Sequence, residues 1–139
     1  EPVQFVIDSG VARLGVLTDL GHGTPHVVEA FSGLDAIVLE CNHDPGLLAA
    51  NPRYPPALKR RIGGLYGHLS NAAAAEIAAA IHGSRLRRIV AAHLSAHNNR
   101  PDLARAALAA ALGAAPEDIR VALQQEGLAW VELGIAMAG

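Results

Sequence analysis

Three apolar segments of the sequence each run into a carboxylate or an imidazole. Asp19, Glu40 and His93 are the polar residues at these points, and His68 follows a glycine in a further loop. The apolar segments are residues 14–17, 36–39 and 88–92. In α/β sheets, ligands bind outside the carboxyl ends of the strands, where loops converge. The pattern therefore predicts one polar site at one edge of a sheet.

Aspartate and histidine together are typical ligands of a borderline divalent ion such as zinc or manganese. Asp19 and His93 alone would not hold such an ion, because catalytic zinc sites keep three protein ligands beside an open position. Other histidines match no metal-ligand spacing, and exposed or capping roles are the alternative for them. They are His22, His26, His43 and His97. For Asp19 taken singly, a turn or a helix cap is the alternative.

Glu40 and His68 have the chemistry of a proton-transfer pair. A carboxylate that orients an imidazole lets that imidazole donate a proton to a leaving oxygen. Such a pair requires proximity in space and not in sequence. We therefore treat this pair as a hypothesis that depends on the fold.

Two other features have weaker chemical signals. The basic residues 59–61 precede two glycines, and either a phosphate group or a solvated helix face would explain them. The glycines match neither a dinucleotide-binding nor a P-loop pattern. Cys41 follows an apolar segment and has no second cysteine to pair with, so inert packing is favoured over nucleophilic chemistry.

The composition is that of one folded domain. The chain has 139 residues, 51% of them hydrophobic and 17% charged, with a formal net charge of −2. These values exclude disorder and a strongly basic nucleic-acid surface, but they leave room for a local basic groove. The single cysteine excludes an internal disulfide and favours the cytoplasm. No apolar run approaches the roughly 18 residues of a membrane span, so we expect no membrane association.

Strand and helix signals alternate through the middle of the chain, and hairpins are expected at both ends. We predict helices over residues 24–32, 57–62, 72–82 and 101–112, and a turn of helix over 46–50 within a loop. Strands are predicted over 3–7, 11–17, 36–39 and 88–92, followed by a terminal hairpin of 119–123 with 128–133 that carries Trp130. This order indicates an α/β domain with a mixed sheet and flanking helices.

Five motifs, in this order, carry a resemblance to a known family. They are residues 18–21 (TDLG), 39–44 (LECNHD), 58–62 (LKRRI), 67–71 (GHLSN) and 92–99 (AHLSAHNN). Together they resemble the C-terminal half of a metallo-β-lactamase-fold hydrolase of the YycJ-like (WalJ) exonuclease branch. Transfer-RNA 3′-processing enzymes are more distant relatives. The resemblance covers nearly the whole chain.

The resemblance implies roles for individual residues. Asp19 is expected to bridge two divalent metal ions, zinc or manganese, and His93 to bind the second ion. Glu40 and His68 are expected to contact the scissile phosphate and to transfer a proton. Residues expected on the substrate side are Asn42, His43, Asp44, Lys59, Arg61 and Asn98.

The family's first metal site has no counterpart in residues 1–139. A His-X-His-X-Asp-His motif and a further histidine build that site, and neither occurs here. The family fold is a four-layer αβ/βα sandwich of two similar halves, of which this chain matches one. Because the chain also opens without methionine, we expect a fragment of a longer protein, or a chain completed by a partner. By itself it would be inactive and hold few or no metal ions.

Three functions remain open at this point. The first is a metal-dependent phosphodiesterase, a nuclease acting on nucleic acid, in the full-length protein. The second is hydrolysis of a small phosphodiester or a thioester at the same metal site. The third is a non-catalytic half-domain that forms a homo-oligomer to cover its exposed sheet face.

Overall fold

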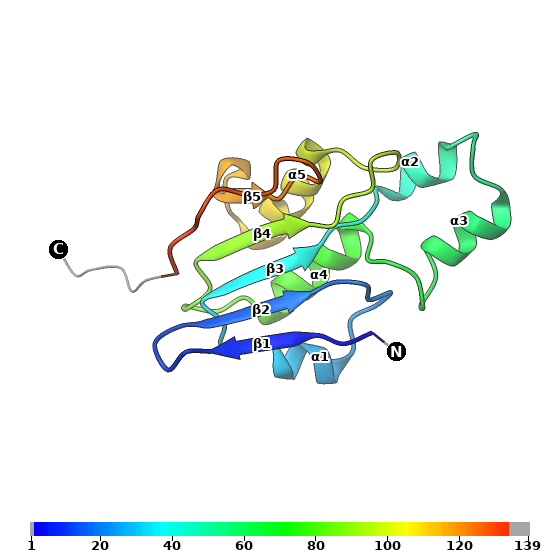
Figure 1. Cartoon of the computed structure of the whole chain (residues 1–139). Helices are drawn as coiled ribbons and strands as arrows, with labels where there is room; N and C mark the ends of the chain where they lie inside the picture. Colours follow the sequence, from blue (N-terminus) through cyan, green and yellow to red (C-terminus); the bar gives the residue numbers. More distant parts are fainter. Residues whose placement is uncertain (1, 134–139) are drawn as a thin grey trace.

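A five-stranded mixed sheet organises the computed structural model, which describes residues 2–133 (Figure 1). The strand order is β1-β2-β3-β4-β5, which also is the order along the chain. β1 pairs with β2 in antiparallel fashion, and the remaining neighbours are parallel. The strands are β1 (Phe5–Asp8), β2 (Arg13–Leu17), β3 (Ala36–Glu40), β4 (Arg88–Ala92) and β5 (Ile119–Val121). The predicted α/β class with a mixed sheet is confirmed.

Helices α1, α4 and α5 cover one face of this sheet and lie behind it in Figure 1. α2 and α3 stand apart, beyond the carboxyl ends of β3 and β4. The helices are α1 (Pro25–Ala30), α2 (Pro45–Ala50), α3 (Pro56–Ile62), α4 (Asn71–Ile81) and α5 (Pro101–Leu112). A short 3-10 helix, Pro116–Asp118, precedes β5. No helix in the described part of the chain is long and apolar enough to cross a membrane.

Local sequence signals explain where the helices begin and end. The side chains of Thr24, Asp44 and Ser70 accept hydrogen bonds from the first turns of α1, α2 and α4. Prolines stand in the first turn of α1, α2, α3 and α5, where their missing N–H costs nothing. α5 ends at Gly113, whose φ of 62° is left-handed. These boundaries match the predicted ones to within two residues.

The core lies between the sheet and the three covering helices. Gly15 marks the covered face, because a Cβ there would stand 2.6 Å from Leu34 and 2.8 Å from Phe31. Fully buried side chains of the core include Leu17, Leu34, Ile37, Leu39, Leu69 and Leu108. Burial of these leucines and isoleucines fixes the register of the parallel strands.

The opposite sheet face carries no helix of the described chain (Figure 1). Because side chains alternate along a strand, the neighbours of Gly15 point to this face, as do their partners on β1. Those partners, Phe5 and Ile7, are 57% and 55% exposed. A hollow on this face is lined by Leu14 and Val38 of the sheet and by residues 128–131 and 133.

The predicted terminal hairpin is wrong. β5 pairs with β4 in parallel, and the only pairing after β5 in the described chain is a single bridge between Leu123 and Gly127. Residues 128–133 form no strand, and Trp130 is fully exposed. The alternation of Ile119 and Val121 reports only that one side of the strand is buried. The crossover through α5 decides which strand it joins.

Asp35 ties three strands together at the edge of the sheet opposite the predicted site. Its carboxylate accepts hydrogen bonds from the backbone N–H of Arg13 at 2.7 Å and from the guanidinium of Arg85 at 2.9 Å. Its carbonyl oxygen accepts from the N–H of Arg87 at 2.9 Å. The bonds from Arg85 and Arg13 hold the pKa of Asp35 below its ordinary value of 3.8. The ionised side chain therefore stabilises the starts of β2, β3 and β4.

We predict that Asp35→Asn lowers stability at neutral pH and that the difference shrinks in acid. Because folding lowers the pKa of Asp35, its contribution is full above pH 3.8 and is lost as pH falls through the folded-state pKa. Urea unfolding midpoints of both proteins between pH 2.5 and pH 7 measure this. Asp8→Asn is the matched control, since Asp8 is 57% exposed in its ion pair with Arg13. A constant difference across the pH range would contradict the prediction.

Candidate metal centre

The four residues predicted from the strand ends come together at one edge of the sheet. Asp19, Glu40, His68 and His93 each offer one ligand atom, and these atoms all lie within 4.8 Å of one another. Asp19 follows β2, Glu40 ends β3 and His93 follows β4, while His68 lies two residues before the N-cap of α4. Parallel pairing explains the arrangement, because it sets the carboxyl ends of these three strands side by side.

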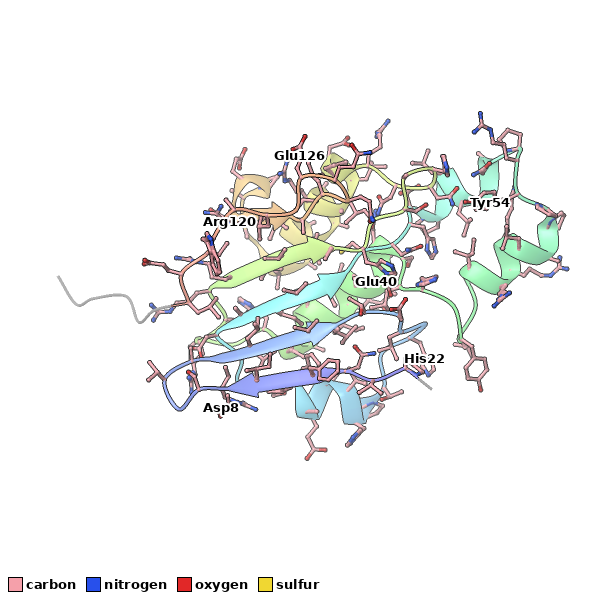
Figure 2. All side chains as sticks on the ribbon, viewed as in Figure 1. Asp8, His22, Glu40, Tyr54, Arg120 and Glu126 are labelled. Atoms are coloured by element: carbon pink, nitrogen blue, oxygen red, sulfur yellow. The ribbon has the colours of Figure 1, made fainter. Side chains whose placement is uncertain are left out.

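Glu40 is the centre of the cluster and is completely buried (Figure 2). Its Oε1 accepts hydrogen bonds from the Nδ1 atoms of His68 at 2.8 Å and His93 at 2.6 Å. Its Oε2 lies 3.4 Å from the backbone N–H of Leu20 and 3.3 Å from that of Leu69. A buried carboxylate is costly unless such donors surround it. Since both Nδ1 atoms donate to Glu40, Nε2 is the nitrogen of each ring that remains available, either to bind a metal ion when neutral or to carry a second proton.

The bond between Glu40 and His93 was missed in the sequence, where Glu40 was matched with His68 alone. The register between β3 and β4 is the feature that indicates this bond. Glu40 of β3 lies beside Ala92 of β4, so the next residue, His93, stands at the same sheet edge. Glu40 thus orients both imidazoles and not only one.

Asp19 and His93 have left-handed backbone conformations, with φ of 58° and 55°. Within residues 2–133 they are the only non-glycine residues with positive φ. Such conformations cost about 1–3 kcal/mol each and persist where the surrounding structure imposes them, often at functional sites. Both residues sit where a strand ends, so the strain coincides with the two predicted metal ligands.

The donor set fits a divalent transition ion. The Asp19 carboxylate is 59% exposed, and its Oδ1 lies 3.6 Å from Nδ1 of His68 and 3.7 Å from Nδ1 of His93. These separations are too long for hydrogen bonds. One accessible carboxylate beside two imidazoles held by a buried carboxylate is a combination that zinc and manganese favour.

Four more predicted residues lie behind the cluster, in the loops that follow β3 and β4. The Asn42 side chain donates to the carbonyl of His93 at 3.1 Å, and Asp44 caps α2. Asn98 is 1% exposed and accepts from the Asn51 amide at 2.7 Å, and His43 is 3% exposed. Burial lowers the pKa of His43, and the nearby His68 lowers it further. The burial of Asn98 and His43 does not support the predicted substrate contact, and for Asn42 and Asp44 that contact stays a prediction.

A buried amide network also escaped the sequence analysis. Asn71 and Asn99 exchange two side-chain hydrogen bonds of 2.9 Å, and Asn99 also donates to the carbonyl of Cys41 at 2.7 Å. These bonds hold the His93 loop and the start of α4 against the end of β3. Asparagines in the GHLSN and AHLSAHNN motifs were the available signal, because buried amides need mutual partners. Burial raises the pKa of the Cys41 thiol to about 12, as expected for an inert packing residue.

Arg61 and Lys59 lie on α3, and only Arg61 approaches the cluster. Arg61 lines a hollow of about 330 Å³ together with Asp19, Tyr66 and His68. The Lys59 ammonium donates to the carbonyl of Ala49 and lines a separate hollow beside His43. Of the two predicted phosphate contacts, Arg61 therefore has the better position.

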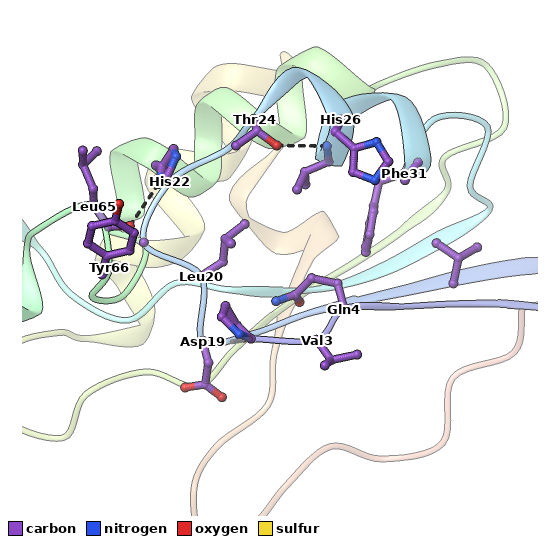
Figure 3. Close-up of a pocket in the computed structure, with 15 residues that line it drawn as sticks. Val3, Gln4, Asp19, Leu20, His22, Thr24, His26, Phe31, Leu65 and Tyr66 are labelled. Atoms are coloured by element: carbon purple, nitrogen blue, oxygen red, sulfur yellow. Dashed lines mark hydrogen bonds between the residues drawn. The ribbon is translucent and has the colours of Figure 1, made fainter.

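A larger hollow of about 820 Å³ also has Asp19 in its lining (Figure 3). His22 and His26 line it, outside the four-residue cluster. The ring of His22 bonds to the carbonyl of Leu65 at 2.9 Å, so it connects two loops.

Comparisons with known proteins give two kinds of likeness. The chain is 35% identical to the exodeoxyribonuclease YycJ of Bacillus anthracis over 105 residues, which are 76% of this chain and 39% of that protein. It is 36% identical to the exodeoxyribonuclease WalJ of Streptococcus pneumoniae over 89 residues, 64% of this chain and 33% of that protein. No protein-family model matches. The chain thus spans about two fifths or less of the length of these relatives.

Among solved structures, the metallo-β-lactamase fold protein YhfI of Bacillus subtilis superposes with a TM-score of 0.63 at 18% identity. The match covers 93% of this chain and 45% of that one. The fold of this chain is therefore that of a metallo-β-lactamase-fold protein. In sequence, the chain resembles a part of the YycJ and WalJ proteins.

We predict that Asp19→Asn abolishes or strongly weakens binding of Mn²⁺ and Zn²⁺ by the intact gene product that contains this chain. Asparagine tolerates the left-handed backbone, so the change removes the charge and leaves the fold intact. Titration calorimetry measures the affinity. Asp44→Asn is the matched control, because asparagine also caps helices and Asp44 is outside the cluster. Equal loss of affinity in both variants would contradict the assignment.

We predict that Gly67→Ala destabilises the protein by about 1–3 kcal/mol. A Cβ at Gly67 would stand 2.1 Å from the carbonyl oxygen of Ile62, a backbone atom that has no room to move. Gly83→Ala is the control, since nothing lies within 4 Å of its added Cβ. Thermal unfolding of the two variants tests the prediction, and equal midpoints would show that the 62–67 loop adapts.

Proposed function

We propose that this chain belongs to a metal-dependent exodeoxyribonuclease that hydrolyses the phosphodiester bonds of nucleic acid. The observation that carries the proposal is Glu40, which holds two imidazoles beside the exposed carboxylate of Asp19. The likeness to the YycJ and WalJ exodeoxyribonucleases supports the substrate class. The single buried cysteine supports a cytoplasmic location.

Asp19 and His93 are the proposed metal ligands, with zinc or manganese as the ion. When bound, such an ion lowers the pKa of a water molecule and neutralises phosphoryl oxygens. Glu40 keeps the ring of His93 in place and fixes the proton on Nδ1, so that Nε2 is available for binding. Arg61 lines the hollow of about 330 Å³ together with Asp19 and His68, and it supplies a guanidinium for a non-bridging phosphate oxygen.

His68 is the proposed proton donor to the leaving oxygen. Its Nδ1–H donates to Glu40, so a second proton on the ring is carried by Nε2, and that proton is the one available for transfer. As the bond between phosphorus and the leaving oxygen breaks, the Nε2 proton passes to that oxygen. His68 then is neutral and retains its Nδ1–H bond to Glu40.

We predict that His68→Ala lowers cleavage of single-stranded DNA by about 10²–10⁴-fold, the usual range for a lost general acid. Hydrolysis of bis-p-nitrophenyl phosphate should fall far less, because p-nitrophenolate leaves without a proton. His93→Ala, the comparison variant, should impair both substrates. The rates are measured in the intact gene product that contains this chain, with Mn²⁺ present. Similar losses on both substrates by His68→Ala would remove it as proton donor.

We further propose that the rest of the fold, with the first metal site, is supplied outside these 139 residues. The coverage of 39% of YycJ and 45% of YhfI supports this. The chain by itself then binds at most one transition ion tightly. Metal analysis of the isolated chain after gel filtration measures this number, and two or more tightly bound ions per chain would contradict the proposal.

The same two preparations, the intact gene product and the isolated chain, distinguish two alternative functions. A small phosphodiester or a thioester as substrate predicts faster turnover of those compounds than of DNA or RNA in parallel assays. The exposed Phe5 and Ile7 favour a homo-oligomer that covers the bare sheet face of the isolated chain. Light scattering of the isolated chain tests that, and a monodisperse monomer would exclude it.

A further inference from the structure

Tyr66 stands between the two hollows that flank Asp19. The hollow of about 330 Å³ and the hollow of about 820 Å³ share two lining residues, Asp19 and Tyr66. The side chain of Tyr66 is almost entirely exposed, at 97%. The exposure of one aromatic ring is ordinary by itself, and what singles out Tyr66 is that it lines both hollows beside Asp19.

We propose that Tyr66 is a base-stacking subsite for single-stranded DNA, next to the phosphate that is cleaved. The inference rests on the proposed function and adds to it a residue that contacts the nucleobase. Base stacking on tyrosine tolerates any sequence, because every base has an aromatic face. That property suits an enzyme that removes successive nucleotides regardless of their identity.

The chemistry of the two hollows matches the alternation of a nucleic-acid strand. The smaller hollow has Arg61 and His68, whose N–H groups suit phosphate oxygens. The larger hollow is lined mainly by apolar side chains, among them Leu20, Val27 and Phe31, which suit bases and sugars. A strand that places a phosphate in the smaller hollow brings the adjoining base to Tyr66.

The backbone that carries Tyr66 is held firmly, although its side chain is free. Residues 62–68 are closed by hydrogen bonds of 2.9 Å from Gly67 N–H to the Gly64 carbonyl and from His68 N–H to the Ile62 carbonyl. The 20–23 loop packs against them without clearance, because a Cβ on Gly21 would stand 2.1 Å from the carbonyl oxygen of Leu65.

His22 bonds to that same carbonyl of Leu65, and Figure 3 shows His22, Leu65 and Tyr66 together at one end of the larger hollow. The tyrosine is therefore presented on a fixed support, so stacking requires little ordering of the backbone. His22 is a positioning residue for this subsite.

Binding of DNA without cleavage tests the subsite directly. A fluorescein-labelled single-stranded oligodeoxynucleotide and an abasic oligomer of equal length are titrated with the intact gene product in EDTA, followed by fluorescence anisotropy. Tyr66→Ala should weaken binding of the base-containing strand about tenfold or more, and Tyr66→Phe by less than about twofold. Neither change should alter binding of the abasic strand.

Tyr54→Ala is the matched control, since Tyr54 is the other tyrosine of the sequence and lies between α2 and α3, outside both hollows. It should bind both strands as the wild type does. Equal weakening on both strands by Tyr66→Ala, no weakening at all, or no measurable DNA binding by the wild type would each overturn the inference. The proposed nuclease fails separately, if DNA is bound through Tyr66 but no cleavage depends on Asp19 when Mn²⁺ is added.

Discussion

The buried carboxylate of Glu40 is the interaction on which the rest of this site depends. It lies at the end of the central strand β3, has no contact with solvent, and receives hydrogen bonds from both imidazoles and the backbone. A charge in that position is tolerable only when its donors are in place. The loops after β2, β4 and α3 each supply or support one donor, so the cluster and the local fold stabilise each other.

The starts and the carboxyl ends of the parallel strands have different roles. Asp35 joins the starts of β2, β3 and β4 by hydrogen bonds from Arg13, Arg85 and Arg87. Glu40 joins the ends of the same strands through side chains that come from distant loops. The carboxylate of Asp35 only holds strands together. The carboxylate of Glu40 also orients two imidazoles, whose Nε2 atoms remain available. Within residues 2–133, the group of side chains that could hold a metal ion lies at the second of these two ends.

The fold and the four central site residues were predictable because each depends on a local or directional rule. Apolar runs, capping residues and prolines mark the elements, and the carboxyl-end rule brings Asp19, Glu40 and His93 together. The destination of β5 was not predictable from the alternation of Ile119 and Val121, which is the same for any partner strand. The Asn71–Asn99 pair was hidden for another reason. Reciprocal amide bonds join residues 28 positions apart, and no periodicity marks them.

The left-handed backbone at Asp19 and His93 sets protein stability against function. Glycine adopts this conformation without a steric penalty. Replacing either residue by glycine would therefore remove the backbone strain. Aspartate and histidine at these positions therefore cost stability that glycine would not, at the ends of two strands that flank β3. In a descendant protein that no longer needed the site, substitutions would be expected first at Asp19 and His93, because they would relieve strain.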